Sequence, residues 1–517
     1  MNRRSEIPGR HLIVQLARYG DLLQTAPLVS AAANGDSPQE VHLLVDASLA
    51  GAAALIDNVA KVHLFDRTAF SKELLSNDLS AAYGRVSVLA QALRSENFHQ
   101  VSNITHTPES ACITALAGAD TIEGLTRTRV AEYSNGLWDR LFRATLTRRG
   151  TGAFHLVDLH LGLSGLSGVD QIKSWLKLAG TKPGSGPVVA FQLGANSPLR
   201  SWNSEMFATT AKLIETAMPS VGIVLVGSKG EQSLAAEFER HHAGVVTNLT
   251  GKTNLQELSE IIAGCSLLIS GDTGTIHLAA ALNVPSVGVY LGMARADDTA
   301  PYREGSIIFE PRHDCYPCPE NNRCGHLDCH GDIPPQAVAA AALSLLKGNT
   351  FAASPSPTYR WRSVKFDKHG SLTLTADTVS QNDWRERMRR FWFDEMNGAC
   401  HHNSDRLLNP TLRELSETTS AALAAARRFE LALIGANQIA KARDMLKHNL
   451  AALEVQAQRS DETGLLAHIF QLELENLPSD PRLVAGRIKL ALENLSRRVK
   501  TFPSRELAAG MPMRVAV

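Results

Sequence analysis

The sequence predicts an α/β protein with two doubly wound domains, followed by a mainly α-helical extension. Short apolar runs alternate with helix-length amphipathic segments twice along the chain, as in parallel sheets that carry helices on both faces. A Gly/Pro-rich linker at 180–187 separates the two series, and a Ser/Pro-rich linker at 349–358 precedes the helical remainder. We therefore expect domains at 1–180, 187–348 and 359–517.

Charge and hydropathy narrow the classes of function. The chain has 517 residues with 52 Lys and Arg against 52 Asp and Glu, so its formal net charge is zero. A general nucleic-acid binder relies on a basic surface, so we expect no nucleic-acid partner. No apolar run approaches the ~20 residues of a membrane span, and the polar N-terminus lacks a signal-peptide core. These features predict a cytoplasmic protein.

The first series begins with an apolar strand at 11–16 and a turn that contains Asp21. A helix is predicted over 22–33 because apolar residues recur at helical spacing and Pro27 falls in the first turns, where proline is tolerated. Asp21 lies at the carboxyl edge of the sheet, where a carboxylate can take a proton from a hydroxyl, although Gly-Asp is also an ordinary helix cap. Further strands are expected at 41–45, 62–65 and 101–105, and further helices at 47–56, 79–94 and 110–117.

Two segments combine arginines with aromatic residues. Residues 126–150 carry six arginines around Trp138 and Phe142, and residues 384–393 have the same character. Each is either a helix face with its arginines in solvent or a docking surface for an anionic acceptor or for lipid headgroups. Peripheral inner-membrane association therefore stays open, as does assembly into a homo-oligomer.

The second series restarts the alternation after the first linker. Strands are expected at 188–193, 222–226, 245–249, 267–270, 286–290 and 307–309, with helices at 204–217, 232–241, 255–265, 276–282 and 335–347. Five glycine-marked loops follow these strands, and in such sheets the ligand lies at the carboxyl ends of the strands. A β-hairpin is predicted over 359–375, and helices at 414–433, 436–457, 463–477 and after Pro481 complete the chain.

The segment 266–282 is the most informative motif, because it is typical of a buried strand, a tight turn and a helix. Gly274 permits close backbone approach, and Thr273 or Thr275 can cap the helix. The free N–H groups and dipole of such a helix start suit a phosphate, whereas Asp272 suits hydroxyl groups beside it. Together they indicate a nucleotide sugar, with an ordinary capped helix as the alternative.

Two further candidates follow other strands of the same sheet. Arg200, in the segment 197–202, has a planar fork that suits a diphosphate, unless it is only a surface arginine. Glu231 begins a helix, where it either binds a ribose or is an ordinary first-turn acid.

Four cysteines fall within fifteen residues and predict a metal finger at 313–330. They are Cys315, Cys318, Cys324 and Cys329. In a cytoplasmic chain such a cluster favours a tetrahedral metal site, with zinc as the default and iron as the alternative. Because no redox machinery is visible, we expect a structural metal; two disulfides would require an oxidising compartment.

With these motifs in place, the sequence resembles glycosyltransferase family 9, the ADP-heptose heptosyltransferases, over residues 10–348. The segments that carry the resemblance are 16–21, 194–202 and 271–281. The resemblance implies a GT-B fold of two Rossmann-like domains, an inverting mechanism and no cofactor for catalysis. By position, Asp21 resembles the general base of the family, and Arg200 stands where many members have lysine. The donor-binding residues we expect are Ser197, Arg200, Glu231, Asp272, Thr273, Gly274, Thr275 and His277.

The implied activity is transfer of heptose from ADP-heptose to a hydroxyl of a lipopolysaccharide core sugar or another glycan, free or lipid-linked. The cysteine cluster is similar to that of the autotransporter heptosyltransferases, so transfer to Ser or Thr of a surface protein is an alternative. A nucleotide-sugar-binding scaffold without catalysis is a second alternative, and an epimerase on the same architecture is a third. A nicotinamide dehydrogenase is disfavoured because no Gly-x-Gly-x-x-Gly follows any strand.

Overall fold

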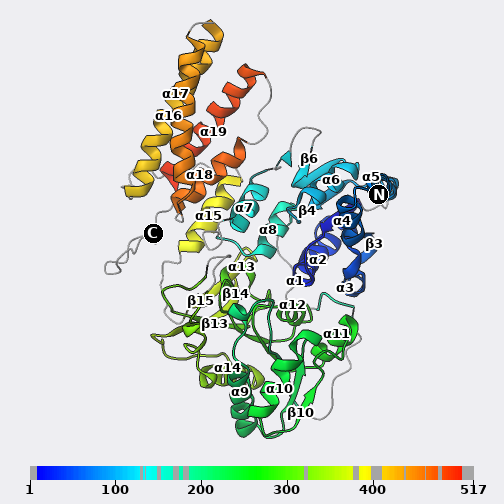
Figure 1. The fold of residues 1–517 in the computed structure, drawn as a ribbon. Coiled ribbons are helices and arrows are strands. Elements are labelled where there is room, and N and C mark those ends of the chain that lie inside the picture. The colour runs from blue at the N-terminus through cyan, green and yellow to red at the C-terminus, as the bar shows by residue number, and fades with distance from the viewer. Residues whose placement is uncertain are drawn as a thin grey trace, which may run out of the picture. The chain divides into compact units, whose positions relative to one another are not determined.

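The computed structural model of the chain divides into two compact units (Figure 1). Unit 1 takes its residues from Met1–Arg127 and His155–Val379, and unit 2 from Thr128–Phe154 and Ser380–Val517. The structure describes residues 9–127, 132–133, 136–147, 153–166, 174–177, 186–318, 324–376, 384–396, 410–435, 438–459, 462–474 and 480–502. Most of the first predicted linker and three arginines of the basic segment, Arg129, Arg148 and Arg149, lie outside the described residues.

The first lobe of unit 1, residues 9–127 and 155–166, contains a five-stranded parallel sheet in the order β3-β2-β1-β4-β5. Its strands are β1 (Arg10–Gln15), β2 (Glu40–Asp46), β3 (Val59–Phe65), β4 (Gln100–Asn103) and β5 (Thr121–Gly124). Its helices are α1 (Tyr19–Leu23), α2 (Ala26–Asn34), α3 (Ala50–Leu55), α4 (Arg67–Leu75), α5 (Leu79–Ser95), α6 (Pro108–Leu116) and α8 (Leu156–Leu163). The predicted doubly wound sheet is therefore present.

The helix predicted over 22–33 is instead two helices. Thr25 is the N-cap of α2, so Pro27 falls in the first turn of that helix. Proline lacks the N–H that a continuous helix would need here, whereas a first-turn N–H has no partner within the helix. The interruption leaves α1 as a short separate turn directly after β1.

The second lobe, residues 186–376, contains an eight-stranded sheet in the order β10-β9-β8-β11-β12-β13-β14-β15. Its strands are β8 (Val188–Gln192), β9 (Gly222–Val226), β10 (Val246–Asn248), β11 (Leu267–Ser270), β12 (Ser286–Val289), β13 (Ile307–Pro311), β14 (Tyr359–Phe366) and β15 (Leu372–Ala376). Its helices are α9 (Ser204–Ala217), α10 (Gln232–His241), α11 (Leu255–Ala263), α12 (Gly274–Ala281), α13 (Ala296–Thr299) and α14 (Pro335–Leu346). Buried aromatic rings of Phe191, Phe207 and Phe238 pack between this sheet and α9 and α10.

The predicted hairpin is formed by β14 and β15, but it belongs to the second sheet and not to the helical extension. β14 pairs antiparallel with β13, and β15 pairs antiparallel with β14. Hydrogen bonds to β13 therefore draw the hairpin into unit 1, and the helices of the extension begin after it.

Unit 2 is a helical body. Its helices are α7 (Gly136–Thr147), α15 (Trp384–Met396), α16 (Pro410–Gly435), α17 (Ile439–Ala457), α18 (Glu462–Glu473) and α19 (Pro481–Thr501). Phe142, Phe391 and Trp392 are buried within it, so these aromatic residues of the two arginine-rich segments serve packing. The short strands β6 (Thr126–Arg127) and β7 (Glu132–Tyr133) complete the described strands. Among the described helices, none combines the length and apolarity needed to cross a membrane.

Candidate active site

Asp21 lies at the carboxyl edge of the first sheet, in the short helix α1. Its Oδ2 accepts a hydrogen bond of 3.1 Å from the backbone N–H of Arg18, the N-cap residue. Helix capping, the alternative to a catalytic role, is therefore present. Within the described part of the chain this is the one hydrogen bond of the carboxylate, so Oδ1 is left to bind another group.

Two glycines allow α1 of the first lobe to touch α12 of the second. A Cβ added at Gly274 would lie 2.7 Å from Cδ1 of Tyr19, closer than carbon atoms approach one another. A Cβ at Gly20 would lie 3.3 Å from Cα of Gly274. Only glycine fits such a contact without displacing a neighbour. As a result, the turn that carries Asp21 meets the start of α12, two residues after Asp272.

The start of α12 has the features of an anion site. Thr273 is its N-cap residue, but the Thr273 side chain makes no cap hydrogen bond. Its hydroxyl instead lies 3.0 Å from Oγ of Ser270. The first N–H groups of α12 therefore lack a side-chain cap, which leaves the positive end of the helix dipole available to a phosphate.

Arg200 and Asp272 form an ion pair beside this helix start. Nη2 of Arg200 lies 2.6 Å from Oδ2 of Asp272 and also donates to its backbone oxygen at 2.5 Å. The two side chains are 17% and 11% exposed, so the charges are largely out of water. Nε of Arg200 is buried without a hydrogen-bond partner among the described residues. A buried donor without a partner is costly, so this N–H suits a ligand oxygen.

The other carboxylate oxygen of Asp272 lies near two further side chains. Oδ1 accepts a weak hydrogen bond of 3.5 Å from Thr299 and lies 3.8 Å from Nε2 of His277. Tyr290 positions Thr299 by donating to its backbone oxygen at 2.8 Å. Burial, followed by the charge of Asp272, raises the pKa of Tyr290 well above its usual value, so its hydroxyl remains a donor.

Glu231 and Thr275 belong to a network that joins the end of β8, the turn after β9 and the start of α12. Glu231 accepts hydrogen bonds from Nε2 of Gln192 at 2.7 Å and from the N–H of Ser228 at 2.6 Å. The hydroxyl of Thr275 donates to Oε1 of Gln192 at 3.1 Å. Both oxygens of Glu231 are therefore used within the protein. Ser197 is half-buried, and its hydroxyl accepts from the N–H of Leu199, next to Arg200.

The cysteine finger packs against two loops of the candidate donor site. The N–H of Cys318 donates to the backbone oxygen of Gly292 at 2.9 Å, and the hydroxyl of Tyr316 donates to that of Ala294 at 2.7 Å. On the other loop, Nε2 of His330 lies 3.2 Å from the backbone oxygen of Leu199. A change in the finger would therefore reach the residues beside Arg200.

The four sulfur atoms are neighbours but are not gathered at ligand spacing. Burial, followed by the nearby thiols of Cys318 and Cys315, raises the pKa of Cys329 to about 11. Among the described residues, no three of the four sulfurs lie within 4.8 Å of one another. The metal finger therefore stays a prediction.

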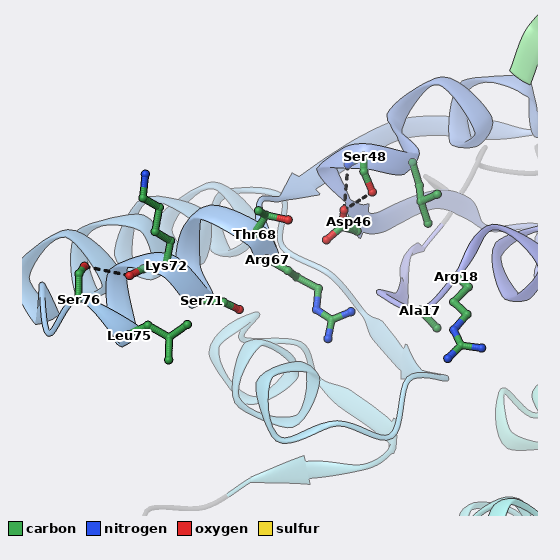
Figure 2. Close-up of a pocket in the computed structure, with 11 residues that line it drawn as sticks. Ala17, Arg18, Asp46, Ser48, Arg67, Thr68, Ser71, Lys72, Leu75 and Ser76 are labelled. Carbon is green, nitrogen blue, oxygen red and sulfur yellow. Dashed lines mark hydrogen bonds between the residues drawn. The ribbon is translucent and has the colours of Figure 1, made fainter. Parts of the chain in front are cut away.

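A pocket of about 890 Å³ lies on the first lobe, beside the turn that precedes Asp21. It is lined by the Ala17–Arg18 turn after β1, by Asp46 at the end of β2 with Ser48 and Leu49 after it, and by one face of α4 after β3. Figure 2 shows Arg67 lying between α4 and the Ala17–Arg18 turn. Nη1 of Arg67 donates to the backbone oxygen of Leu16 at 2.8 Å, which holds the guanidinium at the pocket.

Sequence reasoning missed Arg67 and Lys72 of this pocket. A usable signal was present, because Asp66–Thr68 directly follows a predicted strand of the first sheet, and the carboxyl ends of parallel strands meet at one edge. The pocket residues were missed because helix α4 was not predicted. None of its residues is buried, so it lacks the apolar periodicity that indicates a helix.

Comparisons with known proteins agree with this architecture. Residues 86–326 match the family described as Glycosyltransferase family 9 (heptosyltransferase). A solved glycosyl transferase family 9 structure from Veillonella parvula covers 66% of this chain and 99% of its own length, with a TM-score of 0.54 at 17% sequence identity. This likeness concerns the fold alone, and it confirms the predicted GT-B architecture of two Rossmann-like domains.

Curated relatives match in sequence over different lengths. Lipooligosaccharide heptosyltransferase 2 of Haemophilus influenzae is 30% identical over 131 residues, which are 24% of this chain and 37% of that protein. Lipopolysaccharide heptosyltransferase 1 of Pseudomonas aeruginosa is 25% identical over 320 residues, which are 60% of this chain and 86% of that protein. The more similar match thus spans little more than a third of its relative.

Proposed function

We propose that this chain, which carries a glycosyltransferase family 9 domain, is an inverting transferase that moves heptose from ADP-heptose to an acceptor hydroxyl. The contact between α1 and α12 is the observation that carries the proposal. It brings a carboxylate of the first lobe, Asp21, to an uncapped helix start of the second lobe. A sugar held at that helix start through its diphosphate would have its anomeric carbon near the carboxylate.

The second lobe would bind the donor. The diphosphate would take hydrogen bonds from the first N–H groups of α12 and from Nε of Arg200, which has no other partner among the described residues. Oδ1 of Asp272 would accept a hydrogen bond from a sugar hydroxyl while Oδ2 keeps Arg200 in place. The ion pair is compatible with both roles, since it does not use Nε of Arg200.

The transfer reaction would use Asp21, Arg200 and the first N–H groups of α12. Asp21 takes the proton of the acceptor hydroxyl as the acceptor oxygen attacks the anomeric carbon from the face opposite the diphosphate. The new carbon–oxygen bond forms as the bond to the phosphate breaks, and the electron pair leaves with ADP. Arg200 and the N–H groups of α12 stabilise the negative charge that develops on the diphosphate.

The pocket on the first lobe supports an anionic acceptor. Arg18, Arg67 and Lys72 line it against the single carboxylate of Asp46. Its volume of about 890 Å³ lies within the usual range for small-ligand sites, about 300–1,000 Å³. A glycan with carboxylate or phosphate groups, as in a lipopolysaccharide core, would match this charge.

The finger would hold a structural zinc or iron ion through Cys315, Cys318, Cys324 and Cys329. Such an ion would fix the loops at Gly292 and Leu199, which the finger contacts. Metal analysis of purified protein tests this idea: a bound ion that is lost in Cys318→Ala supports it, and metal-free protein contradicts it.

Calorimetric titration tests the function. We expect ADP-heptose to bind more tightly than ADP, UDP or UDP-glucose, and Asp272→Asn to weaken ADP-heptose more than ADP, because the carboxylate contacts the sugar. Turnover is then measured with an anionic glycan and with a Ser/Thr-containing protein, which separates the two acceptor classes. Tight donor binding without turnover on either would favour the scaffold alternative, and preference for a uridine nucleotide would contradict the heptose donor.

A further inference from the structure

A second cluster of ligand-type side chains lies on the first sheet, away from Asp21. His42 of β2 and His63 of β3 are only 2% and 6% exposed, and Glu96 follows the last residue of α5. In the part of the chain that the structure describes, these three residues alone bring one ligand atom each within 4.8 Å of one another. Neither the sequence motifs nor the proposed transfer accounts for them.

The two imidazoles are held at a spacing that suits a shared ion. Nδ1 of His42 lies 3.1 Å from Nε2 of His63. Two nitrogens that each lie about 2.0–2.1 Å from one tetrahedral ion are about 3.3 Å apart. The rings are stacked at 5.3 Å, and both meet the ring of Phe98 nearly edge-on. This packing fixes the ring orientations before any ion arrives.

His42 also has the outer partner that a metal-bound histidine usually has. Its Nε2 lies 3.0 Å from Oε1 of Glu40, and Nε of Arg10 donates to the same oxygen at 3.0 Å. A carboxylate that accepts the second ring N–H leaves the other nitrogen unprotonated and able to bind metal. Here that nitrogen is Nδ1, which faces His63.

Glu96 supplies the third group and has an exchangeable partner. Its carboxylate forms an ion pair with Nζ of Lys61 and lies 3.6 Å from Nη1 of Arg10. The side chain of Glu96 is 14% exposed, whereas that of Lys61 is 55% exposed. The ammonium of Lys61 can therefore move into water when an ion takes its place at Glu96.

We propose that His42, His63 and Glu96 bind one divalent transition-metal ion of the zinc class. Two imidazoles and a carboxylate suit zinc, nickel or ferrous iron better than magnesium or calcium. The site joins β2, β3 and the end of α5. Because α5 ends just before β4 begins, Glu96 lies at the amino edge of the sheet, opposite Asp21. The ion would clamp the first lobe without touching the substrates.

Cobalt titration of the full chain tests the proposal. Cobalt bound to thiolates gives an intense charge-transfer absorption, whereas a nitrogen–oxygen site gives only the weaker ligand-field bands. The absorption spectrum therefore distinguishes cobalt in the finger from cobalt in this cluster. We expect one equivalent of cobalt without thiolate absorption, lost in His63→Ala and in Glu96→Gln. Lys61→Met should bind cobalt more tightly, because it removes the competing ammonium.

His241→Gln is the matched control, because this exposed histidine of α10 lies outside the cluster. It should keep the wild-type titration. If His63→Ala fails to fold by circular dichroism, Glu96→Gln decides, since it changes a partly exposed side chain and keeps its shape. Cobalt should also raise the melting temperature of Cys318→Ala, in which the finger has lost a ligand. It should not raise that of the double variant Cys318→Ala/Glu96→Gln. If the wild type and Glu96→Gln bind equal amounts of cobalt without thiolate absorption, the proposal is wrong. The two histidines would then be only a hydrogen-bonded pair.

Discussion

A single methyl group at Gly274 tests whether the two lobes form one active site. In Gly274→Ala the new carbon would lie 2.7 Å from Cδ1 of Tyr19, whereas ordinary contact begins at 3.4 Å. The contact must therefore open by about 0.7 Å (3.4 minus 2.7). The obstacle is the ring carbon next to the Tyr19 side-chain stem, so the ring or the α1 turn that carries it has to move.

We expect Gly274→Ala to slow the chemical step and so to lower kcat. A displacement of about 1 Å between reacting groups costs about 10²-fold in rate. For an opening of about 0.7 Å we expect kcat to fall by about 10- to 100-fold, or about 1.4–2.7 kcal/mol of transition-state stabilisation. The donor site lies on the second lobe, so the affinity for ADP-heptose should change far less than kcat.

The assay is steady-state turnover at saturating donor and acceptor, with donor affinity from calorimetry and folding from the melting temperature. Gly51→Ala is the matched control, because a Cβ there meets nothing within 4 Å. The double variant Gly274→Ala/Tyr19→Ala removes the clash and should recover turnover relative to Gly274→Ala.

Wild-type kcat in a folded Gly274→Ala protein would refute the reasoning, because the α1–α12 contact could then open without consequence. A loss of donor affinity that the double variant does not recover would show instead that the methyl group blocks the helix start itself.

Further predictions concern Asp21, Arg200, the finger and buried histidines. Asp21→Asn keeps an oxygen for the Arg18 N–H but cannot accept a proton, so the melting temperature should hold while turnover falls by about 10²–10⁴-fold; turnover near wild type would leave only the capping role. Arg200→Met leaves Asp272 buried without its cation and should weaken both ADP and ADP-heptose in calorimetry, with Arg200→Lys intermediate; unchanged ADP affinity would remove Arg200 from the diphosphate site. Tyr316→Phe loses the bond to Ala294 and should raise the KM for the donor more than it lowers kcat, whereas an unchanged KM would uncouple the finger from the site. Burial lowers the pKa of His155 and of His160 from the usual 6.5 to about 3, so the stability they contribute is complete above pH 6.5 and is lost as the pH falls toward 3. Urea unfolding measured as a function of pH should show this loss, and the free energy of unfolding of His155→Gln should depend less steeply on pH. An equal pH dependence in the wild type and in His155→Gln would contradict the assignment.

Much of the fold could be predicted because its elements carry strong local signals. The bounds of α9, α10, β9 and β11 agree with the sequence expectation to the residue. These elements are amphipathic helices or short, mostly apolar strands, whose patterns are set by burial against one sheet. The exposed helix α4 and the edge strand β5 lack such patterns and were missed.

The division into units depends on contacts that no local pattern contains. The hairpin β14–β15 was predicted correctly, yet its pairing with β13 bridges about fifty residues of chain and could not be read from either segment. Helix α7 likewise groups with the C-terminal helices through ring contacts such as Trp138 with Phe393, which join positions far apart in the sequence.

In the candidate site, too, contacts between individual side chains could not be predicted from local sequence patterns. Sequence spacing predicted that Arg200 and Asp272 lie at one crevice, because both follow strands of one parallel sheet. It assigned Arg200 to phosphate and Asp272 to hydroxyls as separate groups, whereas the structure joins them in an ion pair. This ion pair matters for ligand binding, because the charges of Arg200 and Asp272 already balance each other before a ligand binds. A bare diphosphate then meets a neutral pair, whereas a nucleotide sugar would also bring a hydroxyl to the Asp272 carboxylate. Discrimination between ADP and a nucleotide sugar therefore follows from the pairing itself, and it should be lost when Asp272 alone is neutralised.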